Sequence, residues 1–424
     1  MSLELGSSGR KAALVPFVLT RSEHTLSRRH IDPDALKILF RLRHLGFTAY
    51  LTGGAVRDML LGKTPKDFDI ATDAHPAQIK KYFANAFIIG RRFRLAHIRF
   101  RGGKVIEVAT FRKDPGPAVA PCGPGAPPPQ HAFGTPAEDA WRRDITVNAL
   151  FYDPGTAEVI DYVGGVADLR QGRIRVIGDV AERFREDPVR IWRVIRYAAR
   201  LGFRIGAEVG DEILDSRQLL AGCSEARLFE EFSKDMLGPQ TRTVVAGLRE
   251  FGILSLLLGR IGSAYESDPG LFAGVSALLD IADREKALHR EPGLGEMSVL
   301  FFWPWVESLL AGTPTDPATI LRKEFMDAEM AVALPKSLRA QAIDVMVLLN
   351  RMVRGLRSGN MRWSLRGRPQ YPQASRLYFL IEQHRAPAEG ESFESLFHQA
   401  FPERPLRESG RPRRRRRRKK PALQ

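Results

Sequence analysis

The sequence predicts an α+β protein in which a small mixed β-sheet with helices is followed by an all-helical region. Helix and strand signals alternate over residues 34–112. Strand-like segments return in DITVNALFYDP, EVIDYV and IRVIG. After Asp187-Pro188 the chain is helical, beginning with PVRIWRVIRYAARLGF, and no strand alternation stands out. This order places the sheet in the first half and a helical remainder behind it.

Each element of the first half has a local signal. DPDALKILFRLRHLG is an amphipathic helix that stops at Gly46, and HPAQIKKYFAN is a second helix. FTAYLT and DFDIAT are strands, separated by a glycine turn and the short helix AVRDMLLG. RLAHIRF and KVIEVATF form a hairpin around Gly102-Gly103. In the second half, the apolar run MSVLFFWPWVESLL contains Pro304 and is expected to be a buried pair of helices.

Changes in composition divide the chain into five parts. Residues 113–131 are dominated by proline and glycine and are expected to form a flexible loop within the first domain, because strand signals resume after them. The five expected parts are a flexible leader (1–30), a head (31–178), a helical neck (179–240), a helical body (241–402) and a disordered arginine-rich tail (403–424).

The charge suggests a polyanionic partner. The formal net charge is +16, and nine basic residues lie in 411–420, which leaves +7 for the rest. A basic body as well as a basic tail favours nucleic acid, although solubility alone is the alternative. Two cysteines support neither a disulfide framework nor a cysteine zinc site. Without an evident signal peptide or membrane-spanning run, we expect a soluble, cytoplasmic protein that does not engage membranes, and a monomer is favoured.

Three carboxylates form a candidate metal site. Side chains alternate along a strand, so Asp67 and Asp69 in DFDIAT are expected on one face. Such a pair suits Mg²⁺, which prefers carboxylate and phosphate oxygens; the alternative is an exposed acidic edge. Glu107, between the apolar Ile106 and Val108, can complete the site from a neighbouring strand, or can simply face solvent.

The glycine turn upstream of the acids is a candidate phosphate site. Gly53 and Gly54 let backbone N–H groups approach an anion, and the helix that begins at Ala55 directs its positive end there. Arg57 lies one turn into that helix. Many Gly-Gly turns are only structural, and the position ahead of the acid pair is what strengthens this one.

LTGGAVRDMLLGKTPKDFDIAT resembles the signature of class II nucleotidyltransferases, which comprise bacterial poly(A) polymerases and CCA-adding enzymes. RRDITVNALFYDP resembles the family's ribose-recognition motif, and EDPVRIWRVIRYAARLGF resembles its nucleobase-recognition motif. DYVGGVADLRQGRIRVIGD resembles the segment that joins them. The resemblance implies a polymerase β-like nucleotidyltransferase head with a small mixed sheet, followed by an all-α neck, body and tail.

The resemblance also implies residue roles. It makes Asp67 and Asp69 metal ligands with Glu107 as the third, and it counts Asp144 among the active-site acids. Asp187 and Arg190 would bond the base edge, although Asp187 could instead cap the helix that follows Pro188. Without the resemblance, Asn148 is only a polar strand residue. The expected nucleotide contacts are Gly53, Gly54, Arg57, Arg112, Asp144, Asn148, Asp187, Arg190, Arg193 and Arg196.

Three features favour the poly(A) polymerase branch: IIGRRFRLAHIRF, HAFGTPAEDAWRRD and the arginine-rich tail. The implied activity is template-independent addition of AMP from ATP to RNA 3′ ends with two Mg²⁺ ions. One alternative is a CCA-adding enzyme, and another is a non-catalytic RNA-binding protein on the same fold. Trp192 departs from the family pattern, in which a smaller aliphatic residue is usual, and could reshape the pocket.

The basic tail is expected to contribute sequence-independent RNA affinity. Deleting residues 411–424 should weaken RNA binding and reduce the slope of log K against log salt, because each neutralised phosphate contributes about 0.7 to that slope for single strands. A variant with glutamine at the nine basic positions keeps the length and should behave like the deletion. An unchanged slope, measured by fluorescence anisotropy, would mean that the tail is only a disordered basic end.

Overall fold

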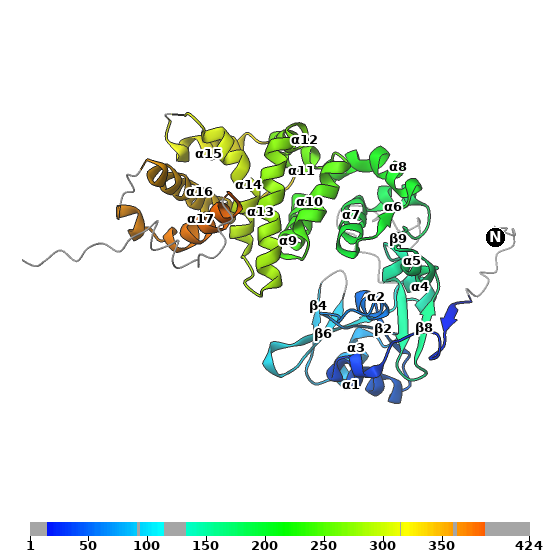
Figure 1. Cartoon of the computed structure of the whole chain (residues 1–424). Helices are drawn as coiled ribbons and strands as arrows, with labels where there is room; N and C mark the ends of the chain where they lie inside the picture. The colour runs from blue at the N-terminus through cyan, green and yellow to red at the C-terminus, as the bar shows by residue number, and fades with distance from the viewer. Residues whose placement is uncertain (1–14, 91–93, 114–132, 314, 359–362, 386–424) are drawn as a thin grey trace, which may run out of the picture.

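The computed structural model describes residues 15–90, 94–113, 133–313, 315–358 and 363–385. The predicted loop 113–131, apart from Lys113, and the predicted tail 403–424 lie outside the described residues. Figure 1 shows the sheet-containing head, from which the chain passes through α6–α8 to the helical body around α13–α17.

The head contains a mixed sheet whose described strands follow the order β1-β8-β7-β2-β3-β6-β5-β4. Neighbouring strands are antiparallel except β3 and β6, which are parallel. The strands are β1 (Phe17–Leu19), β2 (Ala49–Thr52), β3 (Asp69–Thr72), β4 (Ala86–Ile89), β5 (Leu95–Arg99), β6 (Val105–Thr110), β7 (Leu150–Asp153) and β8 (Glu158–Asp161). The expected small mixed sheet is confirmed.

Helices cover the sheet on both faces, but not to the same extent. On one face, Leu39 of α1 and Ile79 of α3 join Val108 of β6 in a core that spans the sheet from β8 to β4. On the other face, Phe111 and Phe151 belong to a smaller core over the middle strands. The described helices of the head are η1 (Arg28–His30), α1 (Pro33–His44), α2 (Gly54–Leu60), α3 (Pro76–Tyr82), η2 (Arg101–Gly103), α4 (Pro136–Trp141), η3 (Thr146–Asn148) and α5 (Gly165–Gln171).

The expectation of a flexible leader over residues 1–30 is wrong for its second half. Strand β1 pairs antiparallel with β8 and forms one edge of the sheet. His24 forms a hydrogen bond through Nε2 with the carbonyl oxygen of Ala157 (2.9 Å), and Leu26 is buried. The segment lacks periodicity because only a few of its residues contact the sheet. Residues 1–14 lie outside the described part.

Two further expectations need correction. The strand predicted within DITVNALFYDP begins only at Leu150, because Thr146–Asn148 forms the 3₁₀ turn η3. The run that contains Pro304 is a single helix, α14 (Leu294–Leu310), and not a helix pair. The Tyr265 hydroxyl donates to the carbonyl of Phe301 (2.7 Å) in the turn before Pro304. Burial of the whole segment outweighs the helix bond that proline cannot make.

The neck and body share one hydrophobic core. It contains Ile145 and Ile174 from the predicted head, Ile195 from the neck and Val299 from the body, so packing does not break at the expected boundaries 178/179 and 240/241. No described helix is both long enough and apolar enough to span a membrane. The elements are β9 (Arg173–Ile174), α6 (Val180–Glu186), α7 (Val189–Leu201), β10 (Arg204–Ile205), α8 (Ala207–Ser216), η4 (Arg217–Gly222), α9 (Glu225–Leu237), α10 (Thr241–Glu250), α11 (Leu254–Leu258), α12 (Arg260–Ser267), α13 (Pro269–Ala287), α14, α15 (Pro317–Met326), α16 (Lys336–Arg357), η5 (Trp363–Gly367) and α17 (Tyr371–Arg385).

Gly165 is required where α5 meets η3. A Cβ atom there would lie 2.3 Å from the carbonyl oxygen of Thr146. Gly165→Ala should therefore lower the free energy of unfolding by about 1–3 kcal/mol, because backbone must move to relieve the overlap. Gly222→Ala is the matched control, since a Cβ there meets nothing within 4 Å, and it should cost less than about 0.5 kcal/mol. Equal thermal unfolding midpoints for the two variants would contradict this packing argument.

Candidate nucleotidyltransferase site

The glycine turn lies directly beside one of the predicted acids. Gly53 follows the last residue of β2 and is the N-cap of α2, with φ of 71°, a conformation that strongly favours glycine. A Cβ atom on Gly53 would lie 3.5 Å from Nη1 of Arg143 and 3.8 Å from Oδ2 of Asp69. The turn and Asp69 therefore form one site, and the positive φ, more than lack of space, favours glycine at position 53.

The parallel pairing of β3 and β6 brings two predicted acids together. Ile70 pairs with Val108, so the preceding residues Asp69 and Glu107 lie side by side on the same face. Ile106 and Val108 are buried while Glu107 is exposed, as the alternation predicts. Glu107 also pairs with His97 of β5, at 3.2 Å between Oε1 and Nε2.

Asp67 reaches the site in a different way from the one expected. Strand β3 begins at Asp69, so Asp67 lies in the exposed segment before it, and strand alternation does not orient its side chain. The negative charge of Asp67 nevertheless contributes to the raised pKa of Asp69. Within the described part of the chain, no three Asp, Glu, His or Cys side chains converge closely enough to hold a metal ion.

The surroundings of Asp69 disfavour its charged form. Its side chain reaches solvent, but surrounding protein atoms displace part of its water. This desolvation, together with repulsion from Glu107 and then Asp67, raises the pKa of Asp69 to about 6, while Arg143 opposes the shift. The site therefore has negative charge that the protein only partly offsets.

A second group of predicted residues meets on the other side of the glycine turn. Arg57 of α2 donates through Nη1 to Oδ1 of Asn148, at the end of η3, and through Nε to Asp58 (2.8 Å). A Cβ on Gly54 would lie 3.4 Å from Nη2 of Arg57. Arg57 is thus a neighbour of both Gly54 and Asn148, next to Gly53.

Arg143 is the site residue that the sequence did not single out. It donates through Nη1 to the carbonyl of Asn148 (2.9 Å), beside Gly53 and Asp69. Arg143 stands in the motif RRDITVNALFYDP, but no local signal distinguishes it from Arg142. Only the fold shows that Arg143 turns towards the acids.

Asp139 holds this arginine in place. Its Oδ2 accepts from Nη2 of Arg143 (2.9 Å), and its Oδ1 accepts from Nε of Arg142 (2.9 Å) and from the backbone N–H of Arg112 (3.1 Å). Asp139 is almost fully buried. Burial alone would raise the pKa of Asp139, but the guanidinium groups of Arg143 and Arg142 outweigh it, and the pKa lies below its usual range. Arg112 is thereby placed at the end of β6, near the site.

Asp144 connects the head to the neck. Its Oδ1 accepts from Nε of Arg190 (3.0 Å), and its Oδ2 accepts from Nη1 of Arg193 (3.1 Å). Both arginines project from α7, as expected. Glu231 of α9 also pairs with Arg193, at 3.1 Å from Nη2. The segment from Arg143 to Asn148 therefore joins the phosphate side of the site to α7.

Two expectations about α7 are wrong. Arg196 is buried and pairs with Glu231 and Asp235, so its guanidinium faces α9 and not a nucleotide. Asp187 does not cap α7, whose N-cap is Pro188; its carboxylate instead accepts from Nη2 of Arg227 (2.7 Å). Periodicity showed which residues share a helix face, but it did not reveal which face α9 would cover.

Trp192 is also turned into the structure. It is buried, and its indole N–H donates to Oδ2 of Asp235 (2.6 Å). It therefore supports the packing of α7 on α9 and does not reshape the pocket directly.

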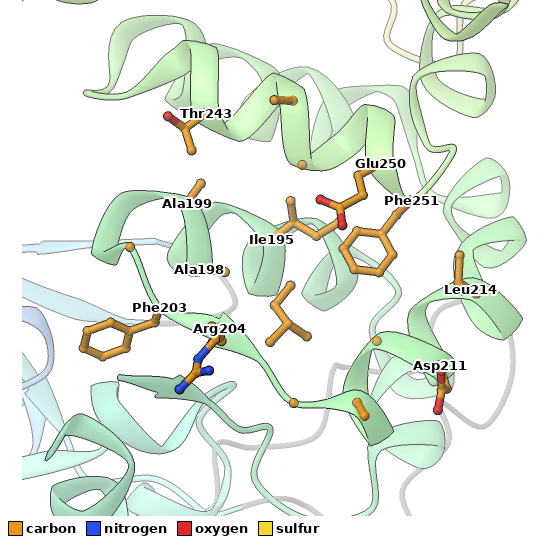
Figure 2. A pocket seen from close by; sticks show the side chains of 17 residues that line it. Ile195, Ala198, Ala199, Phe203, Arg204, Asp211, Leu214, Thr243, Glu250 and Phe251 are labelled. Carbon is orange, nitrogen blue, oxygen red and sulfur yellow. The ribbon is translucent and has the colours of Figure 1, made fainter. Parts of the chain in front are cut away.

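A hollow of about 680 Å³ lies on another side of α7, between α7, β10, α8 and α10. Figure 2 shows the side chains that line it. Its lining includes Ile195, Ala198, Phe203, Thr243 and Glu250. The predicted nucleotide residues are absent from this lining. The hollow is therefore separate from the site built around Gly53 and Asp144.

Comparison with known proteins matches two regions of the chain. Residues 49–175 match the poly A polymerase head domain, and residues 202–261 match a region described as the probable RNA and SrmB-binding site of polymerase A. Poly(A) polymerase I of Salmonella typhi is 36% identical over 383 residues, which cover 86% of this chain and 82% of that protein. The chain belongs to the poly(A) polymerase family. The family resemblance inferred from the motifs is thus confirmed.

CCA-adding enzymes also match this chain, but over a shorter region. The enzyme of Bacillus pumilus is 38% identical over 205 residues, or 48% of this chain and 50% of that protein. Among solved structures, the Bacillus stearothermophilus CCA-adding enzyme in complex with CTP aligns with a TM-score of 0.56 at 26% identity, over 87% of this chain and 88% of that one. The nucleotidyltransferase fold is confirmed.

The buried carboxylate of Glu231 should be essential for stability. Its side chain is 2% exposed and pairs with Arg193 and Arg196, whereas its neighbour Glu230 is 63% exposed and pairs with Lys234. Glu231→Ala should lower the free energy of unfolding by about 3–5 kcal/mol, because it removes one of the two acidic partners of each arginine and leaves buried positive charge in excess. Glu230→Ala should cost less than about 1 kcal/mol.

The pH dependence of stability gives a second readout for Glu231. Burial alone would raise the pKa of Glu231, but Arg196 and Arg193 outweigh it and lower the pKa. Its contribution is therefore complete above the unfolded pKa of about 4.3 and is lost as the pH falls through the lower folded value. Glu231→Ala should lose stability at pH 7 and become less sensitive to acid. Indistinguishable acid titrations for wild type and variant would contradict the pairing.

Proposed function

We propose that this chain adds AMP from ATP to RNA 3′ ends without a template, releasing pyrophosphate. The observation that carries the proposal is the contact region where Gly53, Asp69, Arg57 and Asn148 meet, which joins an anion-binding turn to carboxylates. Similarity to poly(A) polymerase I along 86% of the chain supports RNA adenylation over CCA addition, since the CCA-adding relative named above matches about half.

The residues present suit a divalent cation. Asp67, Asp69 and Glu107 bring negative charge together: desolvation first, and then repulsion from Glu107 and Asp67, raise the pKa of Asp69. In our proposal these carboxylates hold two Mg²⁺ ions. When bound, such ions stabilise negative charge that develops on the reacting phosphate and the attacking hydroxyl.

The chain's own groups would orient ATP. The backbone N–H of Gly54 and the guanidinium of Arg57 would bind the triphosphate beside Gly53, whose own N–H donates to the carbonyl oxygen of Leu150 (3.3 Å). Asn148 and Arg112 would line the sugar and nucleotide pocket. Arg190 and Arg193, held by Asp144, and Asp187, held by Arg227, would present hydrogen-bonding groups to the base. The RNA 3′-oxygen forms a bond to the α-phosphorus as the bond to pyrophosphate breaks.

Nucleotide choice tests the proposal directly. The protein is incubated with an unstructured RNA and with tRNA lacking its 3′ end, with ATP or CTP supplied separately. We expect AMP addition to both RNAs and little CMP addition. CTP incorporation restricted to tRNA would instead favour a CCA-adding enzyme. Tight RNA binding without any pyrophosphate release in Mg²⁺ would favour a non-catalytic RNA-binding protein.

Asp69→Asn tests the role of the carboxylates. It should reduce AMP incorporation by about 10³-fold or more, because losing a metal ligand removes several kcal/mol of transition-state stabilisation, while RNA affinity changes by less than about two-fold. Asp73→Asn, an exposed aspartate just after β3, is the matched control and should retain activity. Equal activities for the two variants would reject the metal-ligand role.

A further inference from the structure

A row of side chains crosses the sheet from the acids to its free edge. Phe87 of β4 pairs with His97 of β5, His97 pairs with Glu107 of β6, and Glu107 lies beside Asp69. Directly paired residues project from the same face of a sheet. Asp69, Glu107, His97 and Phe87 therefore form a continuous line on one face that ends at edge strand β4.

No described element covers this part of the sheet face, which is unusually apolar. Phe87 is 45% exposed, and Ile89 and Val105, which share its face, are 40% and 41% exposed. The core on this face, around Phe111 and Phe151, lies over the middle strands and contains no residue of β4 or β5. The opposite face of the same strands is covered by α1 and α3.

Two cations flank the exposed ring. The guanidinium carbon of Arg99 lies 4.5 Å from the centroid of Phe87, and Nζ of Lys80 lies 5.1 Å from it. Both cations lie over the ring. This combination suits single-stranded nucleic acid, because a base can stack on the ring when the long side chains of Arg99 and Lys80 turn from the ring to the phosphates. These features give the face complementary charge for RNA.

The geometry of the proposed reaction places the incoming RNA 3′ end on the same side of Asp69 as this open face. Gly53, Arg57 and Asn148 would hold the triphosphate on the β2 side of Asp69, since β2 and β6 flank β3 on opposite sides. The attacking oxygen and the leaving pyrophosphate lie roughly in line on opposite sides of the phosphorus. The RNA 3′ end must then approach from the β6 side.

We propose that the 3′-terminal segment of the RNA lies on the open face of β4, β5 and β6, with a base stacked on Phe87 and its phosphates near Arg99 and Lys80. This inference rests on the proposed function. Three strand spacings of about 4.8 Å separate Asp69 from Phe87, or about 14 Å. Phe87 therefore meets a base upstream of the terminal nucleotide and acts as a binding residue for the strand that is extended.

Kinetics with oligoadenylate test the proposal. Phe87→Ala should raise the KM for RNA by about 5- to 150-fold, the range that loss of about 1–3 kcal/mol from one stacked base predicts, with the KM for ATP changed less than about two-fold. Phe87→Tyr should retain wild-type values, while Phe87→Leu, which keeps apolar bulk without a ring, should resemble Phe87→Ala. An unchanged KM for RNA in Phe87→Ala would overturn the proposal, as would an equal effect on ATP.

Phe40 supplies a matched control. It is a 41% exposed phenylalanine of α1 with the guanidinium carbon of Arg28 5.6 Å from its ring centroid, on a helix that packs against the opposite face. Phe40→Ala should change the KM for RNA by less than about two-fold. Thermal unfolding of both variants shows whether each remains folded. An equal increase in the KM for RNA in Phe40→Ala and Phe87→Ala would show a general effect of removing an exposed aromatic ring and would reject the stacking site.

Cross-linking separates this inference from the proposed function. RNAs with a photoreactive base at one of the last few positions are irradiated with the wild-type protein, and the attached peptide is mapped. We expect attachment within residues 80–107 for a base upstream of the 3′ end. If the wild type adds no nucleotide to any RNA, the proposed function fails, while the cross-link still decides where RNA lies. Normal AMP addition with attachment only elsewhere would reject the inference alone.

Discussion

The concentration of negative charge at the start of β3 is the physical constraint on which the arrangement of this site depends. Asp69 lies beside Glu107 because β3 and β6 are parallel neighbours, and Asp67 adds a third charge from the preceding segment. Arg143 is the cation that offsets this charge at Asp69, and buried Asp139 sets its direction. The arrangement leaves a net attraction for cations next to a glycine turn that attracts anions. A nucleoside triphosphate with its metal ions carries both kinds of charge.

The second property of the site is its rigid connection to the helical neck. Asp144 forms ion pairs with two arginines of α7, Arg190 and Arg193. On the other side of α7, Glu231 and Asp235 of α9 form ion pairs with Arg196. Buried ion pairs are a poor source of net stability compared with apolar packing, but they define one geometry strictly because any alternative leaves charge unpaired. The residues that we propose to contact the base are therefore oriented by helix packing, at a distance from Asp69 and Glu107.

Much of the site was predictable because its signals are local. Gly53-Gly54 before a helix, alternation around Glu107 and the order of the family motifs are all readable within short stretches. The errors concern contacts between distant segments. Asp67 lies outside the strand whose alternation was used to orient it, and β1 and β4 are short segments that only their neighbouring strands define. Arg196 and Arg193 belong to the same helix, yet α9 covers one while the other also reaches Asp144.

By itself, the sequence determined the α+β class, the family, the order of sheet and helices, and most of the residues around the nucleotide site, because periodicity, turn chemistry and motifs depend on neighbours along the chain. Tertiary structure alone decided that Arg143 faces Asp69, that Asp187 binds Arg227, and that the face of β4–β6 stays open from the acids to Phe87. These outcomes depend on which surfaces are buried when distant segments pack, and strand order and helix placement set that burial without leaving a local pattern.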